Sequence, residues 1–202
     1  MSDNLDNNIT PASIISGDFD PYDHADNWHC ELVEPSGSVM NKPALLDPFA
    51  NPQTNWKERE SQMINLMHDQ HGLGLAAPQI GSSHRMFVMA HSQLGDIGVY
   101  NPDIVSYSDT DAMWQEGCLS FPLLFLSIKR PEEITAQFTR SDGHTKIELT
   151  MSGRDARIFQ HEYDHLQGSM FLDKVSLLKI NRAKAQRSKL IKKFKKAHKQ
   201  QT

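Results

Sequence analysis

The segment HEYDH at residues 161–165 limits the possible folds of this chain more than any other feature. On an α-helix each residue advances by ~100°, so His161 and His165 would lie on one face about a turn apart. Both imidazoles could then reach one metal ion, and Glu162 beside them could take a proton from a bound water. The alternative is a polar helix face with two solvated histidines. The pattern favours a helix that carries a metal site.

Two histidines leave a metal ion short of ligands, because catalytic zinc-type sites usually take three protein ligands and one water. Cys118 lies in the segment EGCLS, where the preceding glycine allows the backbone to approach closely. A thiolate also binds borderline-soft metals well. These residues predict a site of Cys118, His161, His165 and a water. Cys30 lies in a polar, irregular stretch, and we expect it to take no part.

The composition indicates a soluble globular protein of one ordinary domain with tails. The chain has 202 residues, of which 38% are hydrophobic and 23% are charged. No apolar run approaches the ~18 residues that a membrane span needs. The N-terminus has no basic region followed by an apolar segment, which argues against a secretory signal. We therefore expect a cytoplasmic protein with no membrane segment.

The net charge of −4 conceals an uneven distribution. Residues 1–60 carry 11 acidic and 3 basic side chains, whereas the stretch from Lys174 to the end carries 11 basic side chains and no acidic ones. A basic tail on an acidic body predicts a polyanionic partner for the tail. A merely solubilising helix is the alternative interpretation.

The chain is expected to divide into three parts. Residues 1–31 are rich in Asp, Asn and Ser, which predicts a disordered or irregular arm. Residues 32–174 contain the metal motif and the segments with helix and strand patterns, and they form the predicted catalytic domain. Residues 175–202 form a predicted basic helix or tail.

Apolar spacing predicts three helices, at about residues 55–70, 154–167 and 177–198. Thr54 or Asn55 is a suitable cap for the first helix. Gly72 and Gly168 are the expected stops of the first two. The apolar face of the first helix would hold Trp56, Met63, Leu66 and Met67. In the last helix the apolar members would be Leu178, Ala185, Leu190, Ile191 and Phe194.

Strand patterns fill the middle of the chain. Four segments are separated by Gly, Asp and Pro turns, at residues 85–90, 97–102, 132–140 and 145–151. SDGH at residues 141–144 has the composition of a hairpin turn. An order of helix, strands, helix and helix predicts an α+β fold.

A third motif, GLGLAAPQIG, occupies residues 72–81. It lacks both the GxGxxG spacing of a dinucleotide loop and the Lys-Ser/Thr of a P-loop. Gln79 supplies an amide that could donate a hydrogen bond to an oxyanion. A tight structural turn is an equally good interpretation of this segment alone.

Together, GLGLAAPQIG, EGCLS and QHEYDH closely resemble the three signature motifs of the peptide deformylase family, in the same order and at a similar separation. The resemblance spans about residues 40–195 and includes the basic C-terminal helix of the bacterial long form. It implies antiparallel strands packed around a central HExxH metal-binding helix, with an N-terminal and a C-terminal helix. Other shared segments are Asn101-Pro102, Arg130-Pro131 and HLQGSMFLD.

The resemblance also implies the activity, which is removal of the N-formyl group from the N-terminal methionine of nascent polypeptides with release of formate. It places the metal ligands at Cys118, His161 and His165. The expected ion is Fe²⁺, which Zn²⁺, Ni²⁺ or Co²⁺ can replace. The implied partners are formyl-Met peptides and, through the basic helix, the ribosome or ribosomal RNA. A monomer is expected.

Further roles follow from the same resemblance. Glu162 is implied as the general base and then the acid, while the Gln79 side chain and the Leu119 backbone N–H would hold the oxyanion. Leu73 and Gly74 are implied to bind the substrate.

Glu116 is also assigned to substrate binding, and it resembles one half of a family ion pair with Arg130 that braces the cysteine strand. After EGCLS the family usually continues with an apolar residue, Pro and then Gly or a polar residue. This chain instead reads FPLLFL at residues 121–126. That run either packs as core or borders the substrate and changes specificity.

Two other functions remain open from the sequence alone. A zincin-type metallopeptidase usually takes its third ligand from a Glu or His after HExxH. Downstream of His165 there is no Glu, and His198 lies far away in the basic tail. A ribosome- or nucleic-acid-binding module with a relic site would rest on the basic tail, but the intact set of site residues argues against it.

Overall fold

The computed structural model describes residues 30–36 and 39–198 of the chain. The expected arm at residues 1–31 lies almost entirely outside the described residues. Within the described part, no helix is long and apolar enough to cross a membrane.

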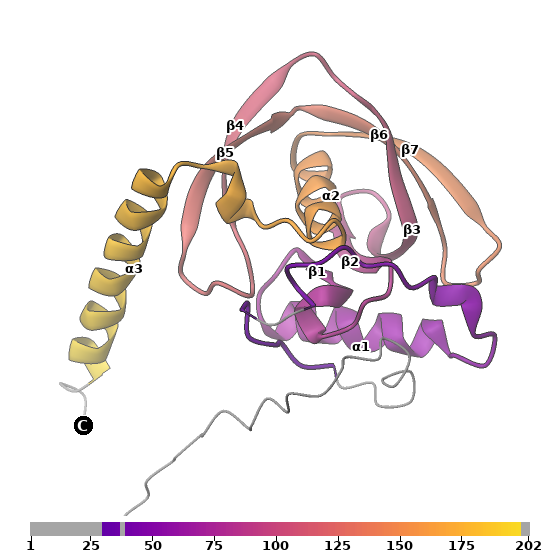
Figure 1. Ribbon diagram of the computed structural model, residues 1–202, viewed down its shortest axis with the longest axis horizontal. Coiled ribbons are helices and arrows are strands. Elements are labelled where there is room, and N and C mark those ends of the chain that lie inside the picture. Colours follow the sequence, from indigo (N-terminus) through magenta and orange to yellow (C-terminus); the bar gives the residue numbers. More distant parts are fainter. Residues whose placement is uncertain (1–29, 37–38, 199–202) are drawn as a thin grey trace, which may run out of the picture.

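An antiparallel sheet of five strands forms most of the domain, in the order β1-β2-β3-β6-β7. A separate antiparallel hairpin, β4-β5, lies beside it (Figure 1). The α+β fold with antiparallel strands is therefore confirmed. The strands are β1 Gly74–Ala76, β2 Met86–His91, β3 Gly95–Tyr107, β4 Asp111–Gly117, β5 Phe125–Pro131, β6 Glu133–Thr139 and β7 Lys146–Ser152.

Helix α2 (Gly153–Leu166), which carries HEYDH, lies at the centre of the molecule (Figure 1). Its Phe159 is fully buried and packs edge-on against Phe87, with ring centroids 5.0 Å apart, and at a tilt against Phe138. Such aromatic contacts stabilise a core beyond the area that they bury. The central position predicted for the HExxH helix is therefore confirmed.

Helix α1 (Trp56–Asp69) begins where the sequence predicts. The Asn55 side chain caps it by accepting the N–H of Glu58, which satisfies one of the otherwise unpaired first-turn donors. Trp56, Met63 and Met67 form its buried face, at helical spacing.

Strand β2 lies between the two helices, and this explains why its sequence is apolar without alternation. Met86 and Val88 belong to the core cluster around α1, whereas Phe87 and Met89 belong to the cluster around α2. Successive side chains of a strand point to opposite faces, so a strand covered on both sides needs apolar residues at every position.

The two predicted helix stops have different outcomes. Gly168 adopts φ 71° directly after α2, as expected for the left-handed position of a C-cap. After α1 that position belongs to His71, with φ 57°, and Gly72 follows it by donating its N–H to the carbonyl of Met67. Both glycines therefore follow the ends of their helices, but the left-handed residue after α1 is His71 rather than Gly72.

Helix α3 (Leu177–His198) follows a short 3₁₀ helix, η3 (Phe171–Lys174), and projects from the β4-β5 side of the molecule (Figure 1). Among its side chains that the structure describes, at residues 177–193, the buried ones are Ile180 and Ala183, near the start of the helix where it meets the domain. The predicted apolar members were partly wrong, since three of them are exposed: Leu178, Ala185 and Leu190. The Phe194 side chain lies outside the described residues.

Candidate metal centre

The three predicted metal ligands come together in the structure. His161 and His165 lie on α2, and Cys118 directly follows β4. One potential ligand atom from each residue lies within 4.8 Å of the other two. The Cys118 Sγ is 3.3 Å from the Nε2 of His165. This set of one thiolate and two imidazoles forms the metal site.

Glu116 orients His161 for metal binding. One carboxylate oxygen, Oε2, lies 2.9 Å from the Nδ1 of His161. If Nδ1 carries the proton and donates a hydrogen bond to this carboxylate, the lone pair of Nε2 is left for a metal ion. Burial raises the pKa of Glu116, but hydrogen bonds from His161 and Arg130 lower it by more, to about 2. Glu116 is therefore ionised at neutral pH.

The carboxylate of Glu116 is held by two arginines. Arg130 donates to both of its oxygens, at 2.7 and 3.0 Å, and Arg157 donates to Oε1 at 3.0 Å. The residue is 5% exposed. Both oxygens therefore have protein partners, while the predicted contact of Glu116 with a substrate stays a prediction. The expected ion pair with Arg130 is present, and it is a buried bidentate pair.

Arg157 is a site residue that sequence reasoning missed. It donates to the carbonyls of Ala112 and Ile128, at 2.7 and 3.1 Å, in addition to Glu116. The side chain thus ties α2 to both strands of the β4-β5 hairpin. A signal was present, because Arg157 precedes His161 by four residues and so shares its helix face.

The electrostatics of the site suit a cation. Burial lowers the pKa of His165 to about 3, so its imidazole is neutral at pH 7 and can donate a lone pair. Burial also lowers the pKa of His161, but Cys118 and Glu116 raise it by more, to about 10. These two groups favour positive charge between them, whether a proton or a metal ion. The donors present therefore fit a divalent transition metal.

Glu162 is buried beside the ligands, and its Oε2 has no hydrogen-bond partner among the described residues. Burial raises the pKa of its carboxyl to about 7. A group with this pKa can both accept and return a proton at neutral pH. A Cβ at Gly74 would lie 2.3 Å from Oε1 of Glu162, so only glycine leaves room for the carboxylate there.

Gln79 has its amide orientation fixed. Its Oε1 accepts the N–H of Ala76 at 2.8 Å, and its Nε2 donates to the Sγ of Cys118 at 3.4 Å and to the Oγ of Ser120 at 3.1 Å. The amide N–H groups therefore point toward the metal site. Ser120 is a second residue that sequence reasoning did not single out.

Two more predicted residues lie around this centre, and Cys30 takes no part in it. Leu119 follows Cys118 and is half-buried, in contact with Gly72. Leu73 is 49% exposed next to Gly74. Burial raises the pKa of Cys30 to about 11, so its thiol stays protonated, and it is absent from the metal-binding group.

A cysteine, two histidines of an HExxH helix and a buried glutamate define a metal-dependent hydrolase. A profile of the family described as polypeptide deformylase matches residues 33–181. The chain belongs to the peptide deformylase family, and its activity is that of a peptide deformylase.

Individual relatives agree with this assignment. The peptide deformylase of Thermotoga maritima is 39% identical over 138 residues, which cover 68% of this chain and 82% of the relative. The chloroplastic peptide deformylase 1B of Solanum lycopersicum is 36% identical over 151 residues, which cover 72% of this chain and 53% of the relative. The crystal structure of a peptide deformylase from Synechococcus elongatus in complex with actinonin superimposes with a TM-score of 0.70. It is 30% identical and covers 78% of this chain and 87% of that one.

Proposed function

We propose that this chain removes the formyl group from the N-terminal methionine of nascent polypeptides and releases formate. The observation that carries the proposal is the buried Glu162 carboxyl beside Cys118, His161 and His165. Membership of the family supports formyl-Met peptides as substrates. A zincin-type peptidase is disfavoured because its third ligand would follow HExxH, whereas Cys118 precedes it.

Each step of the reaction has a candidate residue. When bound, a divalent ion would acidify the attacking water and polarise the formyl carbonyl. Glu162 accepts a proton as the water oxygen bonds to the formyl carbon. The Gln79 amide and the Leu119 backbone N–H donate to the negatively charged formyl oxygen. Glu162 then returns the proton to the methionine nitrogen as the C–N bond breaks, which leaves formate and a free amine.

The substrate backbone would lie along β1. This strand ends the five-stranded sheet and pairs only with β2 among the described strands, so its second edge can bind an extended peptide. Gly74 provides a backbone without a side chain at this edge, and the exposed Leu73 provides an apolar contact. Glu116 then acts as a positioning residue for His161.

The expected ion is Fe²⁺, with Zn²⁺, Ni²⁺ or Co²⁺ as substitutes. The mixed thiolate and imidazole set supports a transition metal over Mg²⁺ or Ca²⁺, which prefer oxygen ligands. The choice of Fe²⁺ among these ions comes from the family resemblance.

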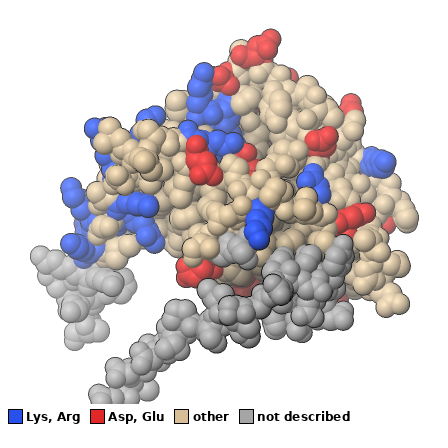
Figure 2. Space-filling model, in the orientation of Figure 1, with Lys and Arg blue, Asp and Glu red and all other residues tan. Residues whose placement is uncertain are grey.

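The basic helix would bind ribosomal RNA, as in the bacterial long form of the family. Helix α3 contains nine Lys and Arg residues and no acidic residue. Figure 2 shows blue side chains gathered over its described part. Residues 1–31 would form an arm, residues 32–174 the catalytic domain and residues 175–202 the ribosome-binding segment. A cytoplasmic monomer fits this role, although a relative in tomato is chloroplastic.

Formate release tests the activity directly. The protein is purified without oxygen, loaded with Fe²⁺, and incubated with formyl-Met-Ala-Ser. The expected result is one formate per free methionine amine, and no product from acetyl-Met-Ala-Ser. Metal analysis of the anaerobically purified protein identifies the native ion. Cleavage of internal peptide bonds without formate release would instead identify a zincin-type peptidase.

A further inference from the structure

The segment after the metal-binding cysteine makes a tight turn that leaves two large apolar side chains exposed. Phe121 donates its N–H to the carbonyl of Cys118, and Leu124 donates to the carbonyl of Phe121. The turn residue Leu123 adopts φ 61° and is 43% exposed, and Phe125 is 51% exposed. A positive φ is unusual for a branched apolar residue, and such strain is concentrated at functional sites.

Phe125 lies next to the metal site. It pairs with Gly117 across the β4-β5 hairpin, and a Cβ at Gly117 would lie 2.8 Å from the Cε1 of its ring. The ring thus covers the backbone of the residue that precedes the ligand Cys118. The Cα atoms of Gly117 and Cys118 are consecutive and therefore about 3.8 Å apart. Each residue of an extended peptide spans about 3.3 Å, so the exposed ring lies within about three such residues of the metal site.

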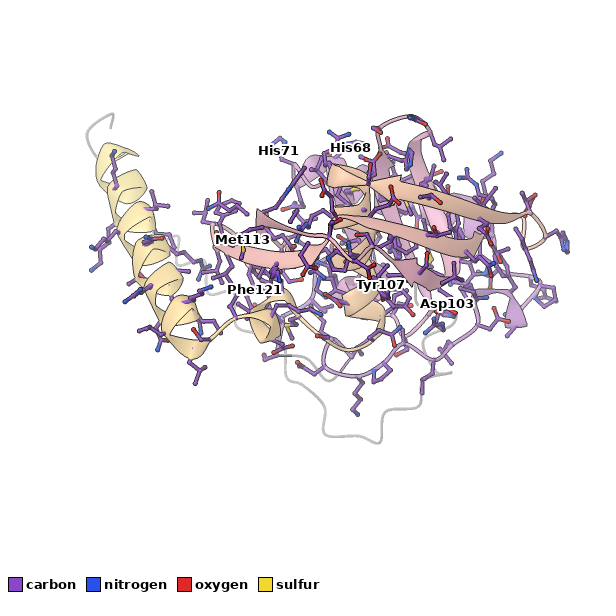
Figure 3. The ribbon with its side chains drawn as sticks, turned by 90° about the horizontal axis from the view of Figure 1, so that it is seen from above. His68, His71, Asp103, Tyr107, Met113 and Phe121 are labelled. Atoms are coloured by element: carbon purple, nitrogen blue, oxygen red, sulfur yellow. The ribbon has the colours of Figure 1, made fainter. Side chains whose placement is uncertain are left out.

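The turn is anchored from behind, so its exposed side chains are held in place. Leu124 and Leu126 are buried in one cluster with Phe171 and Ala183, the latter from α3. Arg187, also on α3, donates from Nε to the carbonyl of Pro122 at 2.7 Å. Phe121 packs against the same cluster, and Figure 3 shows it on the side of the domain from which α3 projects.

We propose that Leu123 and Phe125 select formylated peptides that carry an apolar side chain at the second or third residue. The proposal rests on the proposed function, because the peptide must first present its formyl group to the metal site. Contact with these two side chains removes apolar surface from water, which favours an apolar residue over a polar one. Because the surface is open, we expect the gain in kcat/KM for an apolar residue to be about tenfold, the low end of what one apolar contact provides.

The test compares kcat/KM for three peptides with the Fe²⁺-loaded enzyme: formyl-Met-Leu-Ser, formyl-Met-Ser-Leu and formyl-Met-Ser-Ser. We expect one of the leucine peptides to exceed formyl-Met-Ser-Ser by about tenfold. Phe125→Ser should reduce this ratio to about twofold, whereas Phe125→Leu should keep most of it. Leu123→Asn should also lower the ratio, because it removes the apolar side chain. Asn tolerates a positive φ, so the turn itself should stay intact.

Met113→Ser is the matched control. Met113 is 57% exposed and lies on the same outer face of the hairpin, but it pairs with Lys129, away from Cys118. It should keep the wild-type ratio. Each ratio is measured within one enzyme preparation, so a loss of folded or metal-loaded protein cancels.

Equal rates with all three peptides in the wild type would overturn the proposal while leaving the deformylase function intact. So would a leucine preference that survives in the double variant Phe125→Ser/Leu123→Asn. No turnover of any formyl peptide would count against the proposed function itself.

Discussion

At the scale of single residues, Glu162 is the group whose position matters most. It flanks the metal ligands without being one of them, and the metal-binding group consists of Cys118, His161 and His165. Glu162→Gln should therefore keep the metal but lose the proton transfer, which lowers kcat by at least about 10²-fold. Metal content and formate release are measured on the same sample. An enzyme that retains activity within a few-fold of wild type would contradict this role.

Gly74 permits a second test at this scale. In Gly74→Ala the new Cβ would push against Glu162, and a misplacement of about 1 Å can cost about 10²-fold in rate. Gly98→Ala is a matched control in the same sheet. The new Cβ would lie 2.3 Å from Oε2 of Glu60, the same distance that separates a Cβ at Gly74 from Oε1 of Glu162. We expect both variants to lose stability in urea unfolding, but only Gly74→Ala to lose activity in the folded, metal-loaded state. Equal rates would separate Gly74 from the catalytic geometry.

At the scale of elements, α3 combines an anchoring contact with a run of exposed charges. Ala183 and Arg187 hold the segment after Cys118, while the described lysines that follow them are exposed. Truncation after Ile180 would remove both anchors, so it would not isolate the role of the charges. Neutralising lysines beyond the anchors is the cleaner experiment.

We therefore expect Lys189→Gln, Lys192→Gln and Lys193→Gln, combined, to weaken ribosome co-sedimentation and to spare turnover of short formyl peptides. These three side chains are exposed. Losing three phosphate contacts should make the plot of log ribosome affinity against log salt concentration less steep, by about 2 to 3 in the magnitude of its slope. The control is the combined variant Lys57→Gln, Lys129→Gln and Lys146→Gln, which removes the same charge from exposed positions outside α3. Equal ribosome binding by both triple variants would make α3 a solubilising appendage.

At the scale of the whole molecule, His84 should make folding stability depend on pH. Burial, and to a smaller extent nearby Arg59, lower its pKa from 6.5 to about 4 against the opposing effect of Asp47. Between pH 6.5 and about 4, His84 binds a proton in the unfolded chain but stays neutral in the folded protein. The stabilisation is therefore complete above pH 6.5 and is lost progressively as the pH falls toward 4.

Urea unfolding at pH 7.0, 5.5 and 4.5 measures this effect. The wild type should lose more free energy of unfolding between pH 7.0 and 4.5 than His84→Gln, which cannot titrate there. The difference between the two proteins isolates His84, because protonation of the metal ligands affects both equally. Parallel curves for the two proteins would refute the assignment.

Features that depend on local spacing could be predicted from the sequence. The HExxH helix and the end of α2 at Gly168 follow from helical periodicity and from the backbone needs of helix ends, which also narrowed the cap of α1 to Thr54 or Asn55. The three motifs also determined the family through their order. The strands β1, β4 and β5 were missed, because β1 is only three residues long and the hairpin exposes apolar residues such as Phe125 while it buries the charged Glu116 and Arg130.

Which distant residues meet depends on how the elements pack, and the sequence did not show it. Cys118 and His165 are 47 positions apart, and the β4-β5 hairpin brings them to 3.3 Å. The engagement of Glu116 by two arginines and the contact of Gly74 with Glu162 likewise depend on how α2 packs against the strands. The same holds for the run at residues 121–126, where pairing and burial turned some apolar side chains inward and left Leu123 and Phe125 exposed. Sequence spacing fixes which side chains share a face of one element, whereas contacts between elements depend on packing across the whole domain.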